Sequence, residues 1–459
     1  MDTKYIQHLY WRAGFGINPN ELSLFKKKSK KEIVTTLFRN SKKIEPISVI
    51  NASDYIDLYK NFKSLKKEQR KKLQKMNQKK IRDLNVAWIQ RLCNPHQLLR
   101  ERMTLFWANH FVCKDNNILH FQQFNNLLRT YALGNFRDFV KAVSKSASML
   151  KYLNAKQNKK QSPNENFARE LMELFTLGIG HYSENDIKES AKAFTGWNHK
   201  HNGAFILRKR LHDYNEKTFL GTTGNFTGED IIDKILDQKQ CAFFICEKIY
   251  KYFVNTKIHP SHIDEMVKVF YPTYDIAKLM NHVFLSKWFY NQENRGTKIK
   301  SPIDLLVGIH KVVPIEFKTT KQLIYLQKLL GQQLLNPVNV AGWKMGRHWI
   351  DTNSLMFRLK LPSILLNNAV ISLKGISEFE DTYKMYAEKR KGKKGYLKIT
   401  QDWDIFQSQY SPLTPVQLQS ILLSGILSEN AQDLLKDIAF SNAKDYCIQL
   451  MSLPEYQLC

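Results

Sequence analysis

Apolar residues recur at helical spacing along most of this 459-residue chain. In the segment 83–92, for example, Leu84, Trp88 and Leu92 follow one another at intervals of four and so share one face of a helix. Gly (19) and Pro (13) are scarce, which argues against a turn-dense all-β chain. Because 43% of the residues are hydrophobic, the chain can bury a sizeable core. We therefore expect a mostly α protein.

One large multi-helix domain over residues 1–459 is the expected organisation, because neither an internal repeat nor a linker-like stretch divides the sequence. Two segments could extend from its centre, a basic helical excursion at 55–83 and a C-terminal helical pair at 413–459. One stretch, Ala204–Leu211 (AFILRKRL), is typical of a strand, and we expect it to pair with residues near 218–220. The prediction is thus a helical domain with a small β-hairpin or sheet insertion near residues 204–220.

The sequence from Met1 shows no basic segment followed by an apolar one, which is the pattern of a signal peptide. No apolar run approaches the roughly 18 residues that a membrane-spanning helix needs. We therefore expect no transmembrane segment and a cytoplasmic location.

Positive charge is the strongest compositional feature. Lys and Arg total 70 and Asp and Glu total 42, so the formal net charge is +28. Between Lys60 and Arg82, eleven residues are Lys or Arg and one, Glu68, is acidic. This segment predicts a long helix whose basic face is either a solvated surface or a site for the phosphates of a nucleic acid. The candidate phosphate contacts are Lys66, Lys67, Arg70, Lys71 and Lys72.

A helix is predicted to start at Ser162. Ser162 would cap this helix, Pro163 would take its first position and Glu165 would complete a capping box. The helix would run to about Leu177 and end at Gly178. It carries the densest polar pattern in the chain.

Four polar residues of this helix, Asn166, Arg169, Glu170 and Glu173, fall within one arc of about 100° in a helical projection. Apolar residues occupy much of the remaining surface, and burying two carboxylates is costly unless they are paired. Carboxylates beside an Arg could bind a cation, raise the pKa of one of them or orient a polar substrate. Ordinary pairing along a solvated stripe is the alternative explanation.

Two histidines are further candidates. His110 shares an apolar helix face with Leu99 and Phe106, so it is either a core histidine with satisfied hydrogen bonds or a base or ligand that faces the polar stripe. His212 and Asp213 follow the predicted strand, at a position that suits a site but is also common in ordinary loops.

Trp343 and Trp349 lie in an irregular, Gly-containing segment and could line a pocket or fill a core. Several familiar motifs are absent from the sequence, namely a Walker loop, G-x-G-x-x-G after a strand, H-E-x-x-H and G-x-S-x-G. The two Glu-x-x-His motifs of a di-iron bundle are also missing, since the chain offers Glu170-x-x-Glu173 instead.

Several stretches carry a family resemblance. They are HLYWRAGFG (8–16), LRERMTLFWANHFV (99–112), PNENFARELMELFTLGIGHYSENDIKESAKAFTGW (163–197), HDYNEKTFLG (212–221), NPVNVAGW (336–343) with RHW (347–349), and LPEYQL (453–458). In this order they resemble the bacterial family catalogued as domain of unknown function 1800. The stretch around residues 164–170 is the most specific.

The resemblance implies a helical fold and assigns no activity. Members of the family often lie beside genes for secreted, sulfatase-like proteins, which suggests such a protein as a partner. Some relatives are exported, so the resemblance leaves a periplasmic or exported location open. The most specific segments hold the polar residues singled out above and add Asn164 to them.

The first functional hypothesis is an enzyme with a buried polar site whose substrate is an unknown small molecule or protein. Glu170 and Glu173 would be acid–base groups or, together with His110, the ligands of a divalent cation. His110 or His212 would be a second base, and Arg169 would hold an anionic group or fix a carboxylate. The residues expected to contact substrate are Asn164, Asn166, Asp213, Trp343 and Trp349.

Two alternatives belong to other classes of protein. Nucleic-acid binding through the Lys60–Arg82 face predicts an affinity that falls steeply with salt. A non-enzymatic binding or maturation partner of a secreted sulfatase-like protein predicts an exposed apolar patch and no convergent pocket.

Overall fold

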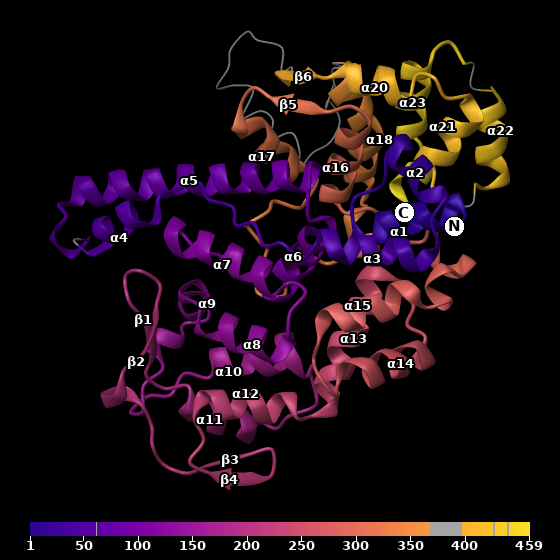
Figure 1. Cartoon of the computed structure of the whole chain (residues 1–459). Coiled ribbons are helices and arrows are strands. Elements are labelled where there is room, and N and C mark those ends of the chain that lie inside the picture. Colours follow the sequence, from indigo (N-terminus) through magenta and orange to yellow (C-terminus); the bar gives the residue numbers. More distant parts are fainter. Residues whose placement is uncertain (61, 368–396, 426, 438–439) are drawn as a thin grey trace. The chain divides into compact units, whose positions relative to one another are not determined.

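The computed structural model describes residues 1–60, 62–367, 397–425, 427–437 and 440–459. Helices dominate, as Figure 1 shows, and the strands of the described residues form small two-stranded antiparallel sheets. This confirms the predicted class, mostly α with small β insertions. Within the described residues, every helix is too short or too polar to cross a membrane.

The described residues form two compact units. Unit 1 comprises Met1–Ser29, Tyr290–Gln333 and the described part of Lys344–Cys459, and unit 2 comprises Lys30–Phe289 and Leu334–Trp343. Each unit is thus built from segments that are distant in sequence. That both units belong to one folding domain stays a prediction.

Unit 2 is an assembly of helices around a central, almost fully buried one. Its helices are α3 (Lys30–Asn40), α4 (Ala52–Lys60), α5 (Lys67–Cys93), α6 (Leu98–His110), α7 (Ile118–Tyr131), α8 (Phe136–Lys145), α9 (Ala147–Tyr152), α10 (Asn166–Glu170), α11 (Glu184–Ala193), α12 (Gly228–Leu236), α13 (Lys239–Phe253), α14 (Pro260–Phe270) and α15 (Ile276–Leu285). Helix α6 is central, since it is buried on all sides. Its Glu101 forms a fully buried ion pair with Arg129 of α7, at 2.6 Å, which compensates both charges.

The strands of unit 2 form two hairpins. Strand β1 (Trp197–His199) pairs with β2 (Phe205–Leu207), and β3 (Lys217–Phe219) pairs with β4 (Thr222–Gly224). A β insertion is therefore present, but the expected pairing of 204–211 with 218–220 is wrong. Each strand pairs with its nearest neighbour across a short turn, because this closes the smallest loop.

The basic segment 60–82 is also arranged differently from the single long helix that we expected. Helix α4 ends at Lys60, and α5 then runs without interruption from Lys67 to Cys93. Helix α5 thus joins the basic stretch to the apolar stretch 83–92, where Leu84, Trp88 and Leu92 are buried. The apolar end anchors α5 in unit 2, while most side chains of its basic end are exposed.

Unit 1 contains the two ends of the described chain. Its helices are α1 (Thr3–Ala13), α2 (Pro19–Lys26), α16 (Pro302–Val312), α17 (Thr320–Leu329), α18 (Thr352–Leu366), α20 (Trp403–Gln409), α21 (Pro415–Leu422), α22 (Glu429–Asp437) and α23 (Ala443–Met451). Strand β5 (Ile315–Phe317) pairs with β6 (Ile399–Gln401). The described part of 413–459 therefore holds α21, α22 and α23, where we expected a helical pair.

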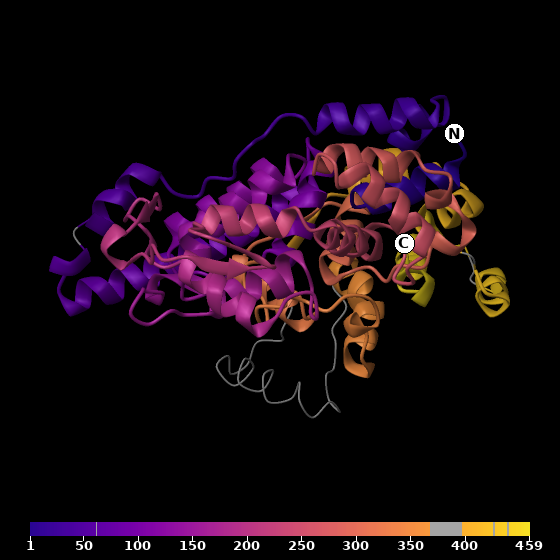
Figure 2. The same ribbon diagram turned by 90° about the horizontal axis from the view of Figure 1, so that it is seen from below.

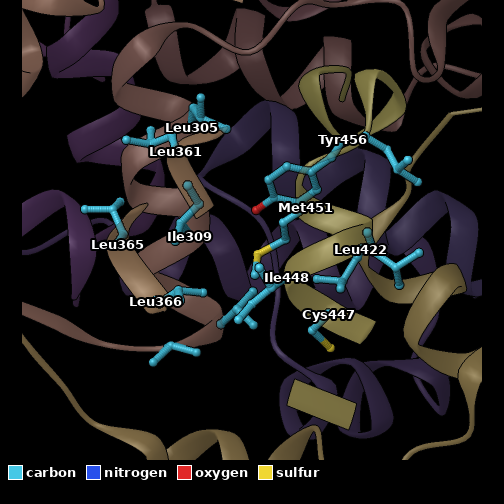
Figure 3. Packing of buried hydrophobic residues seen from close by; sticks show 14 of the residues in the cluster. Leu305, Ile309, Leu361, Leu365, Leu366, Leu422, Cys447, Ile448, Met451 and Tyr456 are labelled. Atoms are coloured by element: carbon cyan, nitrogen blue, oxygen red, sulfur yellow. The ribbon is translucent and has the colours of Figure 1, made fainter. Parts of the chain in front are cut away.

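The apolar core of unit 1 joins segments from both halves of the sequence. Figure 3 shows Leu305 and Ile309 of α16 with Leu361 of α18, opposite Ile448 and Met451 of α23. Helix α16 starts at a capping box formed by Ser301 and Asp304, with Pro302 at its first position.

A buried lysine lies in unit 1. The Lys300 ammonium group is fully buried between the rings of Trp11 and Tyr456, 3.9 and 3.6 Å from their centroids, and donates a hydrogen bond to the Tyr456 carbonyl oxygen at 2.7 Å. Burial lowers the pKa of Lys300 to about 7. The two aromatic faces and the carbonyl offset part of the desolvation cost of the charge.

Lys300 should therefore make stability depend on pH. Its pKa is about 7 in the folded state, against an ordinary value of 10.5, so the unfolded chain binds more protons between these values. The free energy of unfolding should thus rise across this interval, by up to about 5 kcal/mol. We expect Lys300→Met to flatten the rise, measured by urea unfolding at pH 6, 8 and 10. Lys360→Met, at an exposed lysine of α18, should not; equal slopes in both variants would contradict the burial argument.

Candidate functional site

The polar helix predicted at Ser162 begins later than expected. Helix α10 starts at Asn166, and the Asn164 side chain accepts a hydrogen bond from the Asn166 amide at 3.1 Å. Ser162 instead forms a β-bridge with Lys159, so the predicted capping box of Ser162 and Glu165 is wrong. The reason is local, since a residue before proline is driven into extended conformation and here closes a tight turn.

The helix changes its hydrogen bonding after Glu170. Residues Leu171–Thr176 form a π-helical turn, which we call the π segment. The Leu177 amide donates to the Met172 carbonyl at 2.8 Å, five residues back, and the Thr176 hydroxyl donates to the Leu171 carbonyl at 2.6 Å. In this wider turn each residue advances less around the axis, so Glu173 does not lie where an α-helical projection puts it. Such turns are rare and are often found at functional sites.

His110 and Lys248 hold the end of the π segment. His110 Nε2 lies 3.0 Å from the Phe175 carbonyl oxygen, so this nitrogen carries the proton and donates. Lys248 Nζ donates to the Leu174 carbonyl at 2.7 Å and lies 3.4 Å from His110 Nδ1. Burial lowers the pKa of His110 well below its usual value and that of Lys248 to about 8. Both nitrogens of His110 thus have structural partners, which leaves no lone pair for a metal or a second base.

The predicted metal ligands do not assemble. Among the described residues, no group of three or more His, Cys, Asp and Glu side chains is placed to hold a metal ion, so Glu170, Glu173 and His110 form no such group. The physical reason lies in the π segment. Its group that contacts His110 is the backbone carbonyl of Phe175 and not the carboxylate of Glu173.

Arg169 and the two asparagines are used locally. The Arg169 guanidinium donates to both carboxylate oxygens of Glu184, each at 2.9 Å, and to Glu165 at 3.1 Å. Asn166 Nδ2 donates to the Leu153 carbonyl at 3.1 Å. These bonds tie α10 to α11 and α9 and leave Arg169 little capacity for an anionic substrate.

The carboxylates of Glu170 and Glu173 can still accept further hydrogen bonds. Glu170 is half-buried and has no hydrogen-bond partner among the described residues, while Glu173 accepts from the Tyr182 hydroxyl at 3.1 Å. Burial raises the pKa of Glu170, and the charge of Glu173 raises it further. An acid–base role for this pair stays a prediction.

His212 is buried at the end of the short turn that follows β2. Its Nδ1 donates to the Thr195 carbonyl at 2.8 Å, while the Thr195 hydroxyl accepts from the Asp213 amide at 2.8 Å. Nε2 then carries the lone pair and has no partner among the described residues. Asp213 is tied to Lys217, whose ammonium group donates to the Asp213 carbonyl at 2.8 Å. Roles for His212 and Asp213 in catalysis and substrate binding stay predictions.

The two tryptophans belong to different units. In unit 2, the Trp343 backbone is held by the Asn109 side chain, which accepts from its amide at 2.7 Å and donates to its carbonyl at 3.0 Å. The Trp343 ring borders a cavity of only about 20 Å³ beside Trp88, so it fills the core. Trp349 is buried within unit 1.

A much larger cavity of unit 2 was not anticipated from the sequence. It has a volume of about 1030 Å³ and is lined by α4 and α5, by the β1–β2 hairpin, and by residues of α7 and α9. Figure 1 and Figure 2 both show this hairpin near α4. We call this cavity the basic cleft. Its lining cations are Lys60, Lys151, Lys156, Lys200 and Arg208, its lining histidines are His120, His199 and His201, and no Asp or Glu of the described residues lines it.

The backbone around Gly196 positions Arg208 of the cleft. Gly196 has φ +76°, and a Cβ atom there would lie 2.8 Å from the Arg208 carbonyl oxygen. The Arg208 amide donates to the Gly196 carbonyl at 2.8 Å. Glycine therefore allows the close approach of two backbones that places Arg208 beside β1.

The predicted phosphate contacts lie outside the cleft lining. Lys66, Lys67, Arg70, Lys71 and Lys72 are exposed on α5 or just before it. The lining residues of α5 are Leu73, Gln74, Asn77 and Gln78, which lie further along the helix. Arg70 instead packs against the Phe62 ring, 5.4 Å from its centroid. A useful sequence signal was the polar run NHKHN at residues 198–202, which is unusual for a strand and its turn.

These features define a class, a mostly α protein of two compact units with a basic cleft in one of them. A family model described as "Protein of unknown function (DUF1800)" matches residues 8–458, essentially the whole chain. The chain belongs to this family, as its motifs predicted. No curated protein and no solved structure matches the chain.

The structural role of His110 can be tested with His110→Phe, which keeps an aromatic ring and removes the donor to Phe175. Because the carbonyl group and Lys248 would lose a buried partner, we expect the free energy of unfolding to fall by about 1–3 kcal/mol, measured by urea unfolding. Amide exchange at 176–178 should also become faster. The exposed His181→Phe should change stability by less than about 0.5 kcal/mol. Unchanged stability in His110→Phe would refute the role.

The ionised carboxylate of Glu170 should lower the stability of the folded protein at neutral pH. Its folded pKa is raised above the unfolded value, so its contribution is favourable below the unfolded pKa and is lost as pH rises through the folded pKa. Glu170→Gln should therefore raise the thermal midpoint at pH 7, and the gain should vanish near pH 4. Glu216→Gln, at an exposed carboxylate, is the control. A lower midpoint for Glu170→Gln at pH 7 would show that the carboxylate is structurally paired.

Proposed function

We propose that the protein binds a phosphate-bearing polyanion in the basic cleft. The observation that carries the proposal is the grouping of Lys151, Lys156 and Arg208 along one cavity. Burial lowers the pKa of Lys156, and the positive charges of Lys151 and Arg208 lower it further. These cations are thus close enough to repel one another.

The acidic neighbours of the cleft are already occupied. Asp115 forms an ion pair with Lys151 at 2.6 Å and accepts from the Ser148 hydroxyl at 2.8 Å. Lys156, Lys200 and Arg208 have no acidic partner within 4.0 Å among the described residues. The cleft therefore holds positive charge that the described part of the protein does not neutralise.

This excess charge favours an anionic ligand. Like charges in a partly buried site cost free energy, which a bound polyanion would recover, whereas a neutral ligand would not. A concave site lined by one sign of charge also concentrates the field and attracts a ligand of opposite sign. Phosphates would thus bind to Lys156 and Arg208 in the cleft and not to the exposed basic residues of α5. The hypotheses of an acid–base enzyme and of a partner for a secreted sulfatase-like protein stay predictions.

Isothermal titration with sodium tripolyphosphate tests the proposal. We expect one site on the full chain, whose affinity falls as salt rises. The double variant Lys156→Gln/Arg208→Gln should weaken binding by roughly a hundredfold or more, because each charge-assisted hydrogen bond contributes about 1.5–3 kcal/mol.

The matched control is Lys71→Gln/Lys72→Gln, which removes the same charge from exposed positions outside the cleft lining. It should weaken binding only slightly, through the overall field. Equal losses in the two double variants would contradict a site in the cleft, and no binding to the wild type would contradict the proposed function itself.

A further inference from the structure

We propose that the polyanion is single-stranded nucleic acid, with bases stacked on a row of rings in the basic cleft and phosphates held by Lys156 and Arg208. The inference rests on the proposed function and names the ligand class. It is drawn from the aromatic and amide groups of the cleft, which a simple inorganic anion would not use.

Four rings form a row along the cleft lining. The centroids of Phe62 and Tyr59 lie 6.4 Å apart, those of Tyr59 and His120 6.4 Å, and those of His120 and His199 4.8 Å. The rings come from the 3₁₀ turn after α4, from α4, from α7 and from β1. Phe62 and His199, at the two ends of the row, are half-buried, whereas Tyr59 and His120 are buried and support them. Base–aromatic stacking on the two end rings tolerates any sequence, because every base has a π face.

Hydrogen bonds fix the rings of this row. The Tyr59 hydroxyl donates to Asn77 Oδ1 at 2.8 Å, His120 Nε2 donates to the His201 carbonyl at 3.0 Å, and His199 Nδ1 donates to the Lys200 carbonyl at 2.8 Å. Burial lowers the pKa of His120, and it lowers that of His199 to about 4. Both imidazoles are therefore neutral at pH 7, and the half-buried His199 offers a flat, uncharged surface.

The cleft also presents polar groups that suit the edges of bases. His199 Nε2 carries a lone pair, is buried, and has no partner among the described residues. It can accept a hydrogen bond from a base amino or imino group. Gln74 and Gln78 lie one turn apart on α5 and line the same cavity, each with an amide that can donate and accept.

Size and composition separate this ligand from other anions. The volume of about 1030 Å³ is at the upper end of the roughly 300–1,000 Å³ typical of small-molecule sites, so an inorganic ion would fill little of it. A DNA or RNA duplex keeps its bases stacked on one another and cannot use the row of rings. Single strands expose both the base faces and the phosphates, as the ring row and the cations require.

Fluorescence anisotropy on the full chain compares two labelled strands of twelve units at equal salt. One is an oligomer of deoxythymidine, and the other is an abasic oligomer with the same phosphate backbone. The base-bearing strand should bind roughly five- to hundredfold more tightly, because stacking contributes with each base. A duplex of the same length should bind more weakly than the single strand.

Substitutions distinguish the contacts to the bases from the contacts to the phosphates. Phe62→Leu should weaken binding of the deoxythymidine strand by roughly fivefold or more and leave the affinities for the abasic strand and tripolyphosphate unchanged. Gln74→Ala/Gln78→Ala, at exposed positions where misfolding is not expected, should act in the same direction. Lys156→Gln/Arg208→Gln should weaken binding of both strands.

Equal affinity for the base-bearing and abasic strands would overturn the inference, while the proposed function would stand if tripolyphosphate binding still depended on Lys156 and Arg208. Tighter binding to the duplex than to the single strand would also overturn it. If neither strand nor tripolyphosphate binds, the proposed function fails as well.

Discussion

The arrangement of unit 2 depends on how the carbonyl groups of the π segment are satisfied. A π turn shifts the hydrogen bonds of a helix by one residue and leaves carbonyl groups that need donors from elsewhere. Here the donors are His110 of α6 and Lys248 of α13, at 3.0 and 2.7 Å. Three elements that are far apart in sequence are thereby fixed around one buried point. The burial that lowers the pKa of both donors also makes their hydrogen bonds costly to lose.

Local patterns predicted the elements of the fold better than their partners. Spacing of apolar residues placed α6 and the apolar half of α5 correctly, because one helix face suffices to define them. The start of α10 was missed, since Pro163 suited a helix start equally well, and the choice was made by Asn158, whose side chain accepts from the Asn164 amide at 2.9 Å. The π segment could not be predicted from its own residues, because its donors belong to α6 and α13.

Local sequence patterns were also insufficient to locate the candidate site. The polar residues of the family motifs attracted attention because they are dense and periodic, yet Arg169, Asn166 and His110 are largely engaged in holding the fold together. The basic cleft draws its lining from five stretches within residues 56–208, none of which has a clear periodicity. The net charge of +28 pointed to an anionic partner, but only the packing of the β1–β2 hairpin near α4 shows where one could bind.

The two polar regions of unit 2 differ in how their charges are balanced, and this difference bears on their roles. Around α10, Arg169 is paired with Glu165 and Glu184, so its charge is compensated within the protein. In the basic cleft, Asp115 compensates Lys151, whereas Lys156 and Arg208 add charge that no described acid neutralises. Charges that only stabilise a fold are expected in pairs, since unpaired ones in a partly buried site reduce stability. The surplus of one sign in a cavity lined with rings is the observation that supports the proposed anionic ligand.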